Sequence, residues 1–62
     1  MNNSHNAITF AKAALTIFLH DRFWDKAAET DNLLGVIYWE LHDISKAEKH
    51  FRSALELSLI HI

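Results

Sequence analysis

The sequence predicts an all-α fold of three helices, and three observations support this. The 62 residues contain no proline and a single glycine, so few positions favour breaking a helix. Apolar residues recur at helical spacing along three stretches, and turn-forming residues gather in only two places, between these stretches. Half of the residues are hydrophobic and 23% are charged, which favours a folded chain over a disordered one.

The first helix is expected over about residues 5–20, with Ser4 as its N-cap. Its apolar residues return every three or four positions: Ile8, Ala11, Leu15 and Phe18. Further apolar residues widen this stripe, namely Ala7, Ala14 and Ile17. A stripe of that width predicts that the helix makes contacts on two sides.

The second and third helices are expected over about 25–41 and 44–58, with Asp25 capping the second. The apolar face of the second helix carries Leu34, Ile37, Tyr38 and Leu41. That of the third carries Ile44, Ala47, Phe51, Ala54 and Leu55. Two such helices joined by a short turn form an antiparallel hairpin, and a hairpin alone cannot bury its apolar face. The pattern therefore favours a repeat unit that stacks on neighbours.

A set of small and apolar residues over about residues 28–61 resembles one unit of the tetratricopeptide repeat family. The residues that carry the resemblance are Leu34, Gly35, Tyr38, Ala47, Phe51, Ala54 and Leu55. The resemblance implies that residues 25–58 form the helix-turn-helix of the repeat. Residues 1–24 would then form an N-terminal cap or a degenerate repeat.

The same resemblance implies specific packing. Gly35 and Ala47 would lie where the two helices cross, since small side chains let the backbones approach closely. Ala54 would leave room for a following helix to dock. Three positions depart from the family pattern: Asp31 replaces a large aromatic, His42 replaces the glycine of the turn between the helices, and Leu59 replaces a helix-ending proline.

The family binds other proteins, so the resemblance implies a protein-interaction module and not an enzyme. By analogy, one side of the second helix would line a partner-binding groove: Glu29, Asn32, Leu33, Val36, Trp39 and Glu40. The side chain of Trp39 has two possible environments: it could contact a ligand in this groove, or it could be buried under the first helix. Residues 28–41 contain no lysine or arginine, so the expected partner is a basic or apolar peptide segment.

The last six residues, LSLIHI, resemble the translation of a transposase recognition end that is used in sequencing libraries. We therefore expect residues 57–62 to be a non-native tail, with the natural chain leaving this sequence at Glu56. The full-length chain would continue into neighbouring repeats. Two alternatives stay open: a helical appendage of a larger enzyme or sensor, and a short protein that self-associates through its apolar faces.

Other functional classes find little support. A formal charge of −2 with only six lysines and arginines argues against nucleic acid as the main partner. No apolar run approaches the roughly 20 residues that span a bilayer, and the absence of cysteine suits the cytoplasm. The five histidines do not pair at the spacing that brings two metal ligands together on one helix face. We therefore expect no metal, no cofactor and no catalytic group.

Overall fold

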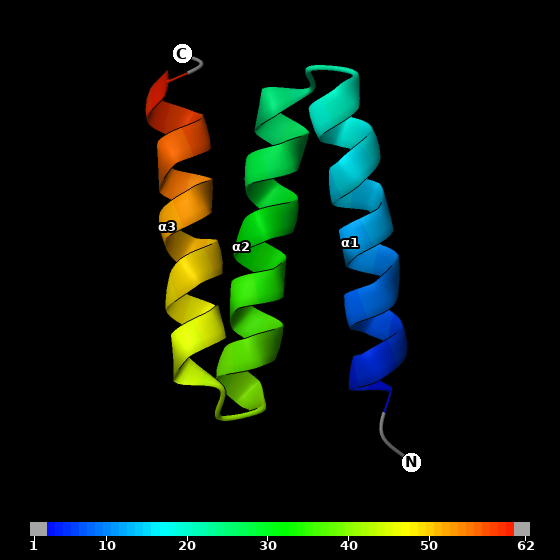
Figure 1. The fold of residues 1–62 in the computed structure, drawn as a ribbon, viewed down its shortest axis with the longest axis vertical. Coiled ribbons are helices and arrows are strands. Elements are labelled where there is room, and N and C mark those ends of the chain that lie inside the picture. The colour runs from blue at the N-terminus through cyan, green and yellow to red at the C-terminus, as the bar shows by residue number, and fades with distance from the viewer. Residues whose placement is uncertain (1–2, 61–62) are drawn as a thin grey trace.

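The computed structural model describes residues 3–60, and they form three α-helices. Their bounds are α1 Ser4–His20, α2 Trp24–Glu40 and α3 Ile44–Ile60, each of 17 residues. The helices lie antiparallel and side by side with α2 in the middle (Figure 1), and their Cα atoms extend over 37 × 20 × 11 Å. The all-α prediction is thus confirmed, and no strand occurs within the described range.

The helices begin and end within two residues of the predicted positions, but two predicted caps are wrong. The residue before α1 is Asn3, and its side chain caps nothing; Ser4 already belongs to the helix. Phe23 precedes α2, which places Asp25 in the first turn of that helix. A carboxylate in the first turn still stabilises the positive end of the helix dipole. Only α3 has an acidic cap, where the backbone N–H of Lys46 donates to Asp43 Oδ1 at 3.3 Å.

Helix α3 continues to Ile60, two residues beyond the predicted end, so the first four residues of the expected tail are helical. The other two, His61 and Ile62, lie outside the described residues. No helix within 3–60 is long and apolar enough to cross a membrane.

Both connections between helices use the same hydrogen-bonded turn. After α1, Phe23 N–H donates to the carbonyl of Phe18 at 2.8 Å and Arg22 N–H donates to that of Leu19 at 3.2 Å. After α2, the equivalent donors are Asp43 and His42, with distances of 2.9 Å to Tyr38 and 2.9 Å to Trp39. These paired bonds define the Schellman ending of a helix, which places one residue in the left-handed region.

The residues in that left-handed position are Arg22 and His42, both with φ of 61°. Glycine adopts this conformation without steric cost, whereas other residues lose about 1 kcal/mol or more. His42 therefore stands where the family pattern has glycine, and Arg22 occupies the matching place in the first turn.

The core lies on both sides of α2. Ala11 of α1, Leu34 and Tyr38 of α2 and Ala47 of α3 form one buried cluster. Three partly buried residues pack against it: Ile8, Leu15 and Phe51. Helices α1 and α3 do not pack closely on each other, since no Cα atoms of the two come within 8 Å. Each outer helix therefore packs mainly on α2.

Gly35 is buried, but its close neighbour differs from the expected one. A Cβ atom added at Gly35 would lie 2.5 Å from Cε1 and 2.6 Å from Cδ1 of Phe51, and the third nearest atom is also in that ring. Ala47 instead packs in the cluster around Leu34. The missing side chain at Gly35 thus makes room for an aromatic ring, where we had expected it to bring two backbones together.

The apolar stripe of α1 is covered on one side only. Ala11 is buried against α2, whereas Phe10 is 78% and Ile17 is 58% exposed. The prediction that this helix makes contacts on two sides is therefore wrong within the chain. Its outer side remains an uncovered apolar surface.

Candidate protein-binding surface

The six residues predicted to line a binding groove all lie on one exposed face of α2. They are Glu29, Asn32, Leu33, Val36, Trp39 and Glu40. The buried residues of α2 recur at Ala27, Asp31, Leu34 and Tyr38, which is the opposite side of a helix with 3.6 residues per turn. We call the exposed side the α2 face.

Trp39 is the largest apolar group on the α2 face. It is 54% exposed, and its neighbours Leu33 and Val36 are 51% and 41% exposed. Burial under α1 was one of the two positions open to Trp39, and this exposure shows that α1 does not cover it. The indole therefore remains accessible to a binding partner.

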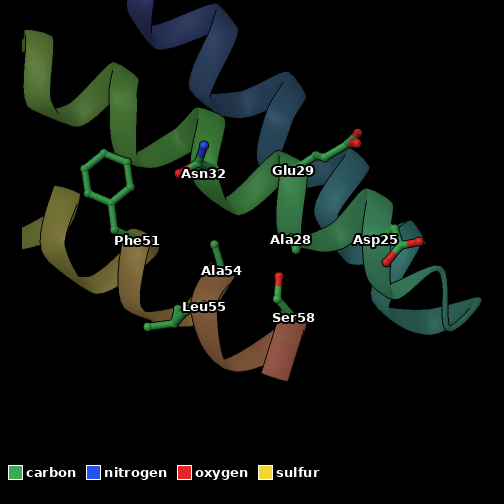
Figure 2. A pocket seen from close by; sticks show the side chains of 8 residues that line it. All are labelled: Asp25, Ala28, Glu29, Asn32, Phe51, Ala54, Leu55 and Ser58. Carbon is green, nitrogen blue, oxygen red and sulfur yellow. The ribbon is translucent and has the colours of Figure 1, made fainter. Parts of the chain in front are cut away.

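A groove of about 610 Å³ runs between α2 and α3 (Figure 2). Its lining residues from α2 are Asp25, Ala28, Glu29 and Asn32. Those from α3 are Phe51, Ala54, Leu55 and Ser58. We call this the α2/α3 groove.

The predicted site and the α2/α3 groove overlap only in Glu29 and Asn32. The other predicted residues lie on the α2 face outside the groove. The groove contains two residues, Ala28 and Ser58, that sequence reasoning did not select. The sequence could have indicated them only through their small side chains, because small residues on facing helices leave space between the helices.

The α2/α3 groove combines an apolar floor with an acidic edge. Carbon-rich side chains of Ala28, Phe51, Ala54 and Leu55 line it, and Leu55 is 59% exposed. Asp25 and Glu29 contribute carboxylates, and no lysine or arginine is among the lining residues. This arrangement favours a ligand with an apolar side and a positive charge.

Most residues of the repeat signature are buried or partly buried. Leu34, Gly35, Tyr38, Ala47 and Ala54 are buried, and Phe51 is partly buried. Leu55 is the exception, because it is exposed at the groove. The signature thus joins α2 to α3 and leaves one leucine available for a further contact.

A buried hydrogen-bonded pair, His50 and Asp31, joins α2 to α3 and was missed by sequence reasoning. His50 Nδ1 lies 2.8 Å from Asp31 Oδ1, and their side chains are only 16% and 3% exposed. The imidazole stacks on the ring of Tyr38, with centroids 5.4 Å apart and planes at 9°. Asp31 had stood out only as a departure from the family pattern. The sequence could have indicated this pair, because Asp31 and His50 are polar residues on the inner faces of the two helices.

Lysine side chains surround the same ring. Lys46 Nζ lies 5.4 Å and Lys12 Nζ lies 6.0 Å from the centroid of Tyr38, within the range of a cation–π interaction. All three helices thus contribute polar groups to this cluster. Because Asp31 and His50 are almost inaccessible, the pair joins helices and does not present a reactive group to a substrate.

Groups that could hold a metal do not assemble in the described part of the chain, where no three histidine, cysteine or carboxylate side chains gather. Comparison with protein-family models, with curated proteins and with solved structures gave no match. The exposed surfaces of α2 and α3 are therefore the candidate functional sites of the described residues.

Proposed function

We propose that this chain is a non-enzymatic protein-interaction module, a hairpin like that of the tetratricopeptide repeat, whose α2 face binds a basic and partly apolar segment of a partner protein. The observation that carries the proposal is the composition of the α2 face. It exposes Trp39, Leu33 and Val36 beside Glu29 and Glu40. Exposed tryptophan is enriched among the residues that dominate binding energy at protein interfaces.

The exposed part of Trp39 is large enough to anchor a partner. An aromatic side chain can bury roughly 150–250 Å², so an exposed fraction of 54% leaves ~100 Å² for a partner to cover. At about 25 cal/mol per Å², this area corresponds to ~2.5 kcal/mol. Loss of that contact would weaken binding by roughly 50-fold.

The acidic residues supply selectivity. Glu29 and Glu40 are exposed, and residues 28–40 contain no lysine or arginine. Complementary charge raises the association rate and disfavours acidic partners, although each exposed ion pair contributes only about 0–1 kcal/mol. Binding should therefore weaken as ionic strength rises.

A pair of matched peptides tests the proposal. One is an amphipathic helix of leucine and lysine, and the other has each lysine replaced by glutamate. We expect fluorescence anisotropy to show binding of the lysine peptide only, together with a shift of the tryptophan emission. Equal binding of both peptides, or binding of neither, would contradict the proposed function.

Two variants and one control locate the binding surface. Glu29→Lys on the α2 face should weaken binding of the lysine peptide, and Trp39→Ala should weaken it more. Glu56→Lys makes the same charge change on an exposed position of α3 outside the groove, and should leave binding nearly unchanged. Circular dichroism of each variant checks that the helices remain. If Glu56→Lys weakened binding as much as Glu29→Lys, the α2 face would not be the binding surface.

A further inference from the structure

Two parts of the molecule carry uncovered apolar surfaces. One is the outer face of α1, which points away from α2 and comprises Asn6, Thr9, Phe10, Ala13, Thr16 and Ile17, all exposed. The other is the α2/α3 groove. Figure 1 shows α1 and α3 at opposite edges of the three-helix layer, with α2 between them.

The outer face of α1 is more apolar than its composition suggests. The hydroxyl of Thr9 donates to the carbonyl of His5 at 3.0 Å, and that of Thr16 donates to the carbonyl of Lys12 at 3.0 Å. Both hydroxyls are therefore satisfied within the helix. The large side chains on this face are Phe10 and Ile17, which are 78% and 58% exposed.

Charge does not oppose contact between the two surfaces. Helix α1 contains no aspartate or glutamate, and its lysine, Lys12, lies against Tyr38 of α2. The α2/α3 groove has the opposite character, with Asp25 and Glu29 and no positive residue. A helix such as α1 can thus enter the groove without bringing a carboxylate towards those two.

The direction of the helices supports the same fit. Successive helices of the chain alternate in direction. If α1 of a second copy lies in the groove and keeps this alternation, it runs antiparallel to α3 and parallel to α2. Its N-terminal end then lies at the end of the layer that holds Asp25 and Glu29. The positive end of a helix dipole is stabilised by nearby carboxylates.

We propose that the α2/α3 groove binds the outer face of α1 from a second copy of this chain. Phe10 and Ile17 of one copy pack on Ala54 and Leu55 of the next. The contact joins two different surfaces, so each copy keeps one free groove and one free α1. Such head-to-tail contacts form open chains unless they close into a ring.

The proposal is independent of peptide binding by the α2 face, although Glu29 and Asn32 belong to both surfaces. Its test is sedimentation of the full 62-residue chain over a range of concentrations up to roughly 1 mM. We expect species larger than a dimer to accumulate as concentration rises. A chain that stays at 7.2 kDa throughout would overturn the proposal.

Two variants, each blocking one surface, establish the geometry. Phe10→Glu blocks the outer face of α1 and Leu55→Glu blocks the groove. Both positions are exposed, so neither change should unfold the chain. We expect each variant alone to be monomeric, and an equimolar mixture to form a dimer that grows no further, because one intact groove meets one intact α1.

The mixture separates this contact from symmetric ones. If α1 paired with α1, Leu55→Glu alone would still dimerise. If groove paired with groove, Phe10→Glu alone would do so. Either result, or a mixture that remains monomeric, would refute the head-to-tail contact. Should Phe10→Glu lose helicity by circular dichroism, Ile17→Glu on the same face replaces it.

A charge-matched control tests the complementarity. Phe10→Lys removes the same ring as Phe10→Glu but places a positive group towards Asp25 and Glu29. We expect the apparent dissociation constant for self-association to be about tenfold lower for Phe10→Lys than for Phe10→Glu. Equal weakening by both would contradict the charge argument. Binding of the lysine peptide to the monomeric Phe10→Glu variant is measured separately, so failure of self-association and failure of the proposed function can be told apart.

Discussion

Replacement of Gly35 by alanine tests whether the Phe51 ring fills the space that this glycine leaves. The added Cβ would lie 2.5 Å and 2.6 Å from two ring atoms, whereas unstrained carbon contacts begin at about 3.5 Å. The ring must therefore move by about 1 Å. Overpacking of this kind costs about 1–3 kcal/mol, and alanine gains back about 1 kcal/mol in helix propensity. We expect Gly35→Ala to lower the free energy of unfolding by up to about 2 kcal/mol.

A double-mutant cycle measures the coupling energy between Gly35 and Phe51. In a Phe51→Ala background the ring is gone, so Gly35→Ala should raise the free energy of unfolding by about 1 kcal/mol through propensity alone. The coupling energy between the two sites is then about 1–3 kcal/mol. Urea unfolding followed by circular dichroism measures all four proteins, with an osmolyte present to keep the double variant folded.

The outcome that refutes this account is additivity. If Gly35→Ala had the same effect with and without the Phe51 ring, within about 0.5 kcal/mol, the ring would not be what requires a glycine. Gly35→Leu gives a cruder check, because its larger side chain must displace the ring further. A chain of 62 residues has a total stability of roughly 3–9 kcal/mol, so we expect that variant to lose helicity.

Three further predictions concern the turns, the His50–Asp31 pair and the cap of α3. Arg22→Gly and His42→Gly should each raise the free energy of unfolding by about 0.5–1 kcal/mol, since both residues have φ of 61°; unchanged or lower melting temperatures would contradict this. His50→Ala leaves the Asp31 carboxylate buried and unpaired, so it should cost roughly 3 kcal/mol in urea unfolding, whereas replacing both residues by leucine should cost much less. Asp43→Ala removes the acceptor for the first turn of α3 and should lower the free energy of unfolding by about 1 kcal/mol, with hydrogen exchange increasing at that end of the helix.

The number and order of the helices could be predicted from the sequence because the signals are local. Apolar spacing and the absence of proline act within each segment and do not depend on distant residues. The caps were predicted less well, since Ser4 and Asp25 are good capping residues at positions where the helix had already begun. The left-handed Arg22 had no signal at all, because the backbone hydrogen bonds of the turn stabilise it and its side chain does not.

The surfaces were predictable only where a single helix defines them. The α2 face follows from the periodicity of one helix, and Glu29, Leu33 and Val36 are exposed as expected. The exposure of Trp39 could not be predicted, because burial under the first helix was equally compatible with the sequence. The α2/α3 groove depends instead on how two helices are aligned along their length. That alignment decides that Ser58 joins Ala28 in the lining and that His50 meets Asp31, and no pattern within one helix specifies it.

The lack of close packing between α1 and α3 has a kinetic consequence. The helices that pack closely are neighbours in the chain, so closing each contact requires only a short loop. Proteins dominated by such local contacts fold within microseconds to milliseconds. Since α2 alone touches both partners, hydrogen exchange should find its amides the slowest, while either outer helix can detach without the other.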